Sequence, residues 1–252
     1  MADRLRLEDD VKTHPGCVRS ANEDSAVGLP RDGIWAVADG MGGHANGQHA
    51  SQTLARLIGD VAAPDDMVLA CGTVSDAIHA ANAEIYAEAE ARGEQMGSTI
   101  VALVMRDRDF AVLWAGDSRA YLYRNNVLHR LTHDHTQVQE MVDRGLLSPD
   151  EAADHPMSHV LARAVGVRPT LELDAVSDTA EPGDIFLLCS DGVYNMVGDD
   201  EVAAILAASG RRSSETLVDL CLERGAPDNV TLILISAQEP TAISFAGSLD
   251  AT

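Results

Sequence analysis

The stretch STIVALVMRDRDFAVLWAG, residues 98–116, decides the architecture of the chain. It holds two apolar, β-branched-rich runs, 98–105 and 110–116, separated by the charged residues 106–109. Two such runs around a short polar connection are typical of a β-hairpin. A hairpin predicts an antiparallel sheet, because the strands of a doubly wound parallel fold alternate with helices instead.

Other parts of the sequence repeat this pattern. A second hairpin is expected over 120–131, with an Asn-Asn pair at its turn. Further strands are expected at 33–39, 184–191 and 229–236. The last two are almost continuously apolar, which indicates strands that are covered on both faces.

Segments with helical periodicity lie between these strands. The segment from residue 73 has Thr73 or Ser75 as a possible N-terminal cap, and the last three segments end at a glycine, a common helix stop. Hairpins with interspersed helices predict an α+β fold with antiparallel sheets inside and helices outside. The expected helices cover 49–62, 73–92, 136–145, 199–210 and 213–225.

The composition is that of one globular domain. The chain has 252 residues, of which 46% are hydrophobic, enough to bury one large core. Aromatic residues make up only 4%, so a core of Val, Leu, Ile and Ala is expected. The sequence shows no signal-peptide pattern and no apolar run long enough to span a membrane, which predicts a cytoplasmic protein. Residues 1–237 are expected to form the domain and 238–252 a flexible tail.

The formal net charge of −22 limits the partners of this chain. An acidic surface repels nucleic acid and anionic membranes, so neither is an expected partner. Solubility is the ordinary explanation for any single acidic residue, whereas a cluster of carboxylates can hold cations. The four cysteines are widely spaced without a C-x-x-C pair, which indicates neither a disulfide framework nor a zinc site.

Four aspartates share one local design. Asp39, Asp117 and Asp191 follow an apolar run and adjoin a glycine, and Asp228 stands just before an apolar run begins. One such aspartate is usually a turn or cap residue. Four converging carboxylates would raise one another's pKa unless a cation compensates them, and oxygen ligands favour Mg²⁺ or Mn²⁺ over zinc. Next to Asp39, Gly40 allows close approach of the backbone and offers its carbonyl as a further ligand.

The stretch RSANED, residues 19–24, supplies a candidate phosphate ligand. A planar guanidinium binds phosphate through two parallel hydrogen bonds, which suits Arg19 to this role. The alternative for Arg19 is a surface salt bridge with the nearby Glu23.

Together these stretches resemble the metal-dependent Ser/Thr protein phosphatases of the protein phosphatase 2C family, in its bacterial form. The similarity covers roughly residues 14–236, and the stretches occur in the family's order. They are RSANED, VADGMGGHANG, GSTIV, WAGDSRAYL, LTHDHT, HPMSHVLARAVG, CSDGV and APDNVTLI.

The resemblance implies a four-layer αββα sandwich, with two central antiparallel β-sheets flanked by helix pairs. It also implies a binuclear Mn²⁺ or Mg²⁺ centre that activates water to hydrolyse phosphoserine and phosphothreonine. In this pattern Asp39 bridges the two ions, with the Gly40 carbonyl on one ion and Asp191 and Asp228 on the other.

The remaining roles follow from the same resemblance. Asp117, together with Asp191, would hold the third ion often found in bacterial members. Glu23 and Asp24 would act through metal-bound water, and Arg19 would hold the phosphate.

Three positions depart from the family's pattern. Met41 stands where eukaryotic members have a histidine that acts as general acid, and His44 is the nearest substitute. The alternative for His44 is a packing role at a helix start. Thr136 replaces a commoner serine, and His159 replaces a frequent asparagine in the flap-like segment 145–160.

The sequence leaves two alternatives to an active phosphoprotein phosphatase. A non-enzymatic phosphoprotein-binding regulator would be favoured by loss of a metal ligand, and every ligand position is filled. A phosphatase of anti-sigma-factor antagonists usually carries sensor domains and lacks a clear RSANED-like stretch. The expected partners are phosphorylated Ser/Thr proteins and a cognate Ser/Thr kinase, and the expected oligomeric state is a monomer.

Overall fold

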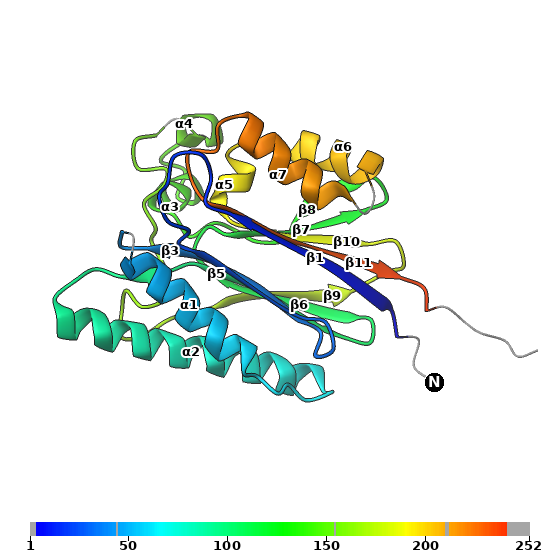
Figure 1. Cartoon of the computed structure of the whole chain (residues 1–252), viewed down its shortest axis with the longest axis horizontal. Coiled ribbons are helices and arrows are strands. Elements are labelled where there is room, and N and C mark those ends of the chain that lie inside the picture. The colour runs from blue at the N-terminus through cyan, green and yellow to red at the C-terminus, as the bar shows by residue number, and fades with distance from the viewer. Residues whose placement is uncertain (1–3, 44, 154, 210–211, 241–252) are drawn as a thin grey trace, which may run out of the picture.

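The computed structural model describes residues 4–43, 45–153, 155–209 and 212–240. Figure 1 shows two stacked β-sheets with helices on both outer faces. Every strand pairing in both sheets is antiparallel. The four-layer αββα sandwich is thereby confirmed.

One sheet joins the two ends of the described chain. It has five strands in the order β1-β11-β10-β7-β8, and Arg6 of the first pairs with Gln238 of the last in sequence. Its strands are β1 (Arg6–His14), β7 (Arg119–Arg124), β8 (Val127–Arg130), β10 (Ile185–Cys189) and β11 (Val230–Gln238).

The other sheet has six strands, in the order β2-β3-β5-β6-β9, with the short β4 paired to the end of β3. Both expected hairpins are confirmed, and β5 pairs with β6 as the opening stretch predicts. The strands are β2 (Asp24–Leu29), β3 (Ile34–Met41), β4 (Gly97–Ser98), β5 (Ile100–Arg106), β6 (Asp109–Ala115) and β9 (Asp174–Thr179).

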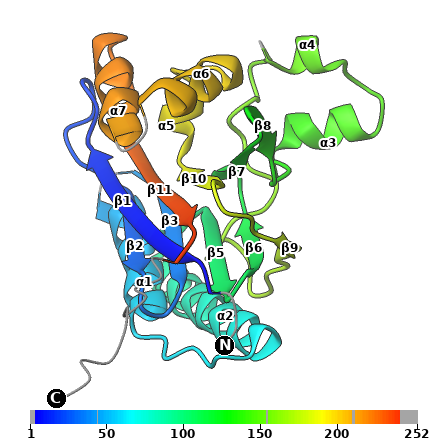
Figure 2. The ribbon, with the colours of Figure 1, turned by 90° about the vertical axis from the view of Figure 1, so that its right-hand side faces the viewer.

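Helices cover both outer faces of the sandwich. The six-stranded sheet carries α1 (Ala45–Gly59) and α2 (Met67–Arg92), and the five-stranded sheet carries α5 (Asp191–Tyr194), α6 (Asp199–Ser209) and α7 (Ser213–Glu223). Figure 2 shows α3 (Gln137–Asp143) and α4 (Pro149–Ala153) projecting together beyond one edge of the sandwich. In the described residues, no helix is both long enough and apolar enough to cross a membrane.

The core between the sheets is less purely aliphatic than the composition predicts. Trp35, Phe110 and Phe186 are among its largest fully buried side chains. The two phenylalanines, from opposite sheets, meet edge to face with ring centroids 4.8 Å apart. Both tryptophans and these two phenylalanines lie where the two sheets meet, and their large area makes them strong contributors to that core.

The start of α2 differs from the expectation. The helix begins at Met67, and its cap is Asp66, whose side chain accepts a hydrogen bond from the Leu69 backbone N–H. Thr73 lies inside the helix, where its hydroxyl donates to the Leu69 carbonyl. An aspartate cap about two turns earlier therefore replaces the expected Thr73 or Ser75 cap.

Candidate active site

Five aspartates from both sheets converge at one end of the sandwich. Asp24 and Asp39 lie opposite each other on the paired strands β2 and β3. Asp117 lies in the connection that carries the chain from β6 in one sheet to β7 in the other. In the five-stranded sheet, Asp191 follows β10 as the first residue of α5, and Asp228 precedes β11.

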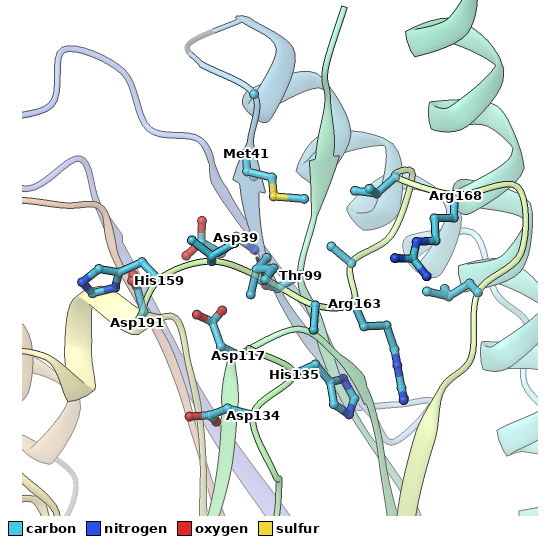
Figure 3. Close-up of a pocket in the computed structure, with 18 of the residues that line it drawn as sticks. Asp39, Met41, Thr99, Asp117, Asp134, His135, His159, Arg163, Arg168 and Asp191 are labelled. Atoms are coloured by element: carbon cyan, nitrogen blue, oxygen red, sulfur yellow. Dashed lines mark hydrogen bonds between the residues drawn. The ribbon is translucent and has the colours of Figure 1, made fainter. Parts of the chain in front are cut away.

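Most of the expected site residues line one cavity of about 1000 Å³. Figure 3 shows Asp39, Asp117 and Asp191 gathered around the same part of this cavity. Asp24 is not on the cavity wall and is only 7% exposed. His44 lies outside the described residues. The expected residues on the wall are Arg19, Glu23, Asp39, Gly40, Asp117, Asp191 and Asp228.

Burial and mutual repulsion make these carboxylates poor anions in the metal-free protein. Burial, followed by the charges of Asp24 and Asp191, raises the pKa of Asp39 well above its usual range. Burial raises the pKa of Asp24 to about 7, and burial with the charge of Asp191 does the same for Asp117. Burial and the charge of Asp228 raise the pKa of Asp191, and a hydrogen bond between the Asp191 and Asp39 carboxyls opposes this rise. The site therefore favours added positive charge.

The donor set fits a hard divalent cation. One carboxylate oxygen of Asp24, Oδ1, is buried without a hydrogen-bond partner, while Oδ2 accepts from the Ser190 hydroxyl at 2.8 Å. An unsatisfied buried carboxylate oxygen is costly and calls for a cation or ordered water. As they stand among the described residues, no three or more Asp, Glu, His or Cys side chains are grouped closely enough to hold a metal ion. The carboxylates instead surround an open cavity, and oxygen-only ligands of this kind favour Mg²⁺ or Mn²⁺.

Hydrogen bonds from a neighbouring strand segment fix the Asp39 backbone. The Asp39 N–H donates to Thr99 Oγ1 at 3.0 Å, and the Asp39 carbonyl accepts from the Thr99 N–H at 2.8 Å and from Ser98 Oγ at 2.9 Å. Thr99 Oγ1 also lies 2.6 Å from Ser118 Oγ, next to Asp117. The GSTIV stretch thus ties Asp39 of one strand to the Asp117 turn. The sequence gives Thr99 no role, although the stretch that contains it is one of the matching motifs.

A buried asparagine fixes the backbone of the loop that carries Glu23, beside Asp228. Asn229 is 4% exposed, and its side-chain amide donates to the carbonyls of Pro15 and Ala21 at 2.9 and 3.0 Å. Its side-chain oxygen accepts from the Glu23 N–H at 2.8 Å. One side chain therefore fixes the 15–23 loop beside Asp228, a function that the sequence alone did not identify.

Arg19 pairs with a different residue from the one considered in the sequence. Its Nη2 lies 2.7 Å from Asp228 Oδ2, and this pair, rather than one with Glu23, is the main cause of the raised pKa of Arg19. The Arg19 side chain is 52% exposed and lines the cavity. It is therefore close to the carboxylates and still accessible to a bound anion.

Gly40 is required by close packing. A Cβ atom at this position would lie 2.0 Å from the Gly47 carbonyl oxygen of α1. The Gly40 N–H donates to the Glu23 carbonyl at 3.2 Å. Glycine thus lets β3, the start of α1 and the Glu23 segment meet at the cavity wall.

Of the three departures, Met41 and His159 lie at the cavity, whereas Thr136 caps α3, where its side chain accepts a hydrogen bond from the Gln139 N–H. Met41 follows Gly40 on the wall and carries no transferable proton. His159 also lines the cavity, and its charge lowers the pKa of Asp191.

A two-sheet sandwich with carboxylates at one end defines the class of the metal-dependent phosphatases, and comparison with known proteins agrees. The family model for protein phosphatase 2C matches residues 20–220. The serine/threonine phosphatase stp of Listeria monocytogenes is 35% identical over 240 residues, covering 91% of this chain and 95% of that protein. The chain belongs to the protein phosphatase 2C family.

Solved structures show the same fold. PppA, a key regulatory component of the T6SS in Pseudomonas aeruginosa, is 38% identical with a TM-score of 0.86, covering 92% of this chain and 97% of that one. The catalytic domain of the serine/threonine phosphatase PstP, solved in complex with two manganese ions, is 33% identical with a TM-score of 0.82. That match covers 93% of this chain and all of the PstP chain.

The raised pKa values predict how the metal-free protein responds to pH. Asp24 and Asp117 have pKa values of about 7 when folded, against about 3.9 for unfolded aspartate, so the folded state holds protons that the unfolded chain has released. Each group contributes roughly 2–4 kcal/mol to the free energy of unfolding. This contribution is fully present below about pH 4 and is lost as the pH rises through about 7. In EDTA, the melting temperature should be lower at pH 8 than at pH 5.

Two comparisons check this assignment. Excess Mn²⁺ should raise the melting temperature more at pH 8 than at pH 5, and Asp24→Asn should flatten the pH dependence in EDTA. A melting temperature in EDTA that does not change between pH 5 and pH 8 would contradict the assigned electrostatics.

Thr99→Val should weaken the site without altering its charge. The substitution keeps the side-chain shape but removes the oxygen that accepts from the Asp39 N–H and contacts Ser118. Loss of such a supporting group typically costs about 10–100-fold in metal affinity or activity. Titration with Mn²⁺, followed by turnover of a phosphothreonine peptide, measures the change in metal dependence. An unaltered Mn²⁺ dependence would show that the Thr99 hydroxyl is dispensable.

Proposed function

We propose that the converging aspartates hold two divalent cations with which this chain, a metal-dependent serine/threonine phosphatase of the 2C family, hydrolyses phosphoserine and phosphothreonine in proteins. The observation that carries the proposal is the set of five aspartates at one end of the sandwich, in which Asp24, Asp39, Asp117 and Asp191 have raised pKa values and Asp24 has a partnerless buried oxygen.

The proposed ligands divide between the two sheets. Asp39 would lie between the ions, the Gly40 carbonyl would serve one of them, and Asp191 and Asp228 would serve the other. Asp117 would join Asp191 at a third position. Manganese or magnesium would suit this set of oxygen donors.

Asp24 and Glu23 are proposed to act on the cations indirectly, through ordered water, and not as direct ligands. Asp24 lies off the cavity wall and accepts from Ser190, which supports an indirect role through ordered water. Glu23 is held at the wall through its backbone N–H by Asn229.

When bound, two divalent cations acidify water and neutralise charge on phosphoryl oxygens. Arg19 is proposed to bind the phosphoryl oxygens through its guanidinium, which the ion pair with Asp228 holds at the cavity mouth. The hydrogen bonds around the Asp39 backbone would keep its carboxylate fixed near the phosphoryl group held by Arg19, and hydrolysis requires the attacking water, the phosphorus and the leaving oxygen to lie in line.

Asp191→Asn should abolish turnover and lower Mn²⁺ affinity, because it removes a charged oxygen ligand from the centre of the cluster. Isothermal titration with Mn²⁺ and hydrolysis of a phosphothreonine peptide measure both effects. Arg19→Ala is the matched comparison: it should keep Mn²⁺ binding and raise KM for phosphate esters. Full activity of the wild-type chain in excess EDTA, with metal content verified, would rule out the metal mechanism.

His44 remains the proposed proton donor to the leaving oxygen, on the sequence alone. A serine or threonine alkoxide needs protonation and p-nitrophenolate hardly does, so His44→Ala should slow phosphopeptide hydrolysis by about 100-fold and slow p-nitrophenyl phosphate far less. Equal losses on both substrates would assign His44 a packing role.

We further propose a cytoplasmic monomer that opposes a Ser/Thr kinase acting on the same proteins, with residues 1–237 as its catalytic domain. The family supports this over a non-enzymatic regulator, as does the presence of every proposed ligand among the described residues. The alternative of an anti-sigma-factor-antagonist phosphatase is less favoured because the chain keeps its RSANED stretch. Light scattering and dephosphorylation of a kinase encoded by a neighbouring gene test these points.

A further inference from the structure

The cavity has a second side that the proposed chemistry does not use. Figure 3 shows Arg163 and Arg168 together on one side of the view, with Asp191 and His159 on the other and Asp39 between them. All five residues line the same cavity of about 1000 Å³. Such a cavity is larger than one phosphoryl group requires, so it has room for residues that flank a phosphothreonine.

The segment that carries Arg168 is fixed from behind by helix α2. Asn82 is 3% exposed, and its amide donates to the Arg168 carbonyl at 3.0 Å while its oxygen accepts from the Gly166 N–H at 2.7 Å. Gly166 has φ +84°, and a Cβ there would lie 2.2 Å from Ile85 of α2. The backbone beneath Arg168 is therefore anchored, although its side chain lies at the surface.

Arg168 differs from the other arginines of the cavity in having no acidic partner among the described residues. Arg163 pairs with Asp174, and Arg19 pairs with Asp228. Among the described residues, no carboxylate pairs with Arg168, in a chain with 40 acidic residues and only 18 lysines and arginines. A guanidinium that lines the cavity from an anchored backbone, with no carboxylate partner among the described residues, is suited to a negatively charged group of the substrate.

We propose that Arg168 is a specificity-determining residue that binds an anionic group, a carboxylate or a second phosphoryl group, flanking the phosphorylated residue of the substrate. This inference rests on the proposed function, which places the reacting phosphoryl group at the aspartate side of the cavity. The flanking anion then reaches the Arg168 side. Phosphothreonine peptides with acidic or doubly phosphorylated surroundings are the resulting substrate class.

The test uses the full chain with Mn²⁺ and a set of phosphothreonine peptides. In each peptide one flanking position carries Asp, phosphothreonine, Ala or Lys. Wild-type kcat/KM at low salt should be about three- to tenfold higher for the best Asp or phosphothreonine peptide than for its Ala counterpart. The Asp and phosphothreonine arms show which anion is preferred.

Variants assign the preference to Arg168. Arg168→Gln should remove it, and Arg168→Glu should favour the Lys peptide, while p-nitrophenyl phosphate turnover stays unchanged in both. Arg31→Gln, at the turn between β2 and β3 away from the cavity, should keep the wild-type preference.

Three results would overturn the inference: no wild-type preference for a flanking anion, a preference that survives Arg168→Gln, or an equal loss in Arg31→Gln. In each case the Ala peptide would still be hydrolysed, so the proposed function would stand. Absence of Mn²⁺-dependent hydrolysis of every substrate would overturn both.

Discussion

Repulsion among buried carboxylates is the constraint around which this end of the molecule is built. Asp24, Asp39, Asp117, Asp191 and Asp228 come from both sheets and from the connection between them. Burial raises the pKa of the first four. The sandwich supplies the rigidity needed to hold such like charges together. Its centre is packed by aromatic contacts between the sheets and by the apolar strands on either side.

Neutral hydrogen bonds, rather than ion pairs, do most of the local positioning. Thr99 and Ser98 fix the Asp39 backbone, Ser190 fixes one oxygen of Asp24, and Asn229 fixes the loop that carries Glu23. Each of these side chains is 4% exposed or less. Neutral supports of this kind hold the carboxylates in place without cancelling the negative charge that a cation requires.

The sequence predicts the elements that depend on residues close to one another along the chain. The two hairpins, the strands β3, β10 and β11 and the five larger helices follow from periodicity and turn residues, and the left-handed Asn125 and Asn126 match the expected tight turn. Strand β1 was missed because its residues are largely polar and its partner, β11, lies more than 200 residues away. The Arg19–Asp228 pair joins distant segments, which periodicity does not report. The Asp66 cap is a local contact, but it lies about two turns before the expected Thr73 or Ser75 cap.

The convergence of the aspartates could be anticipated, since each stands at a strand end and the matching motifs of the family connect them. The side chains that hold the aspartates in place could not be anticipated, because Thr99, Ser190 and Asn229 act through contacts between distant segments. Arg168 lies beyond the matching motifs, so its position beside the cavity became visible only in the fold.

The central claim is that these carboxylates exist to bind divalent cations. Anomalous diffraction at the manganese edge, from crystals grown with Mn²⁺, tests it directly. The account predicts two strong peaks in the cavity, one shared by Asp39 with the Gly40 carbonyl and one by Asp39 with Asp191 and Asp228. A cavity without anomalous peaks at saturating Mn²⁺, or peaks only elsewhere on the surface, would contradict it.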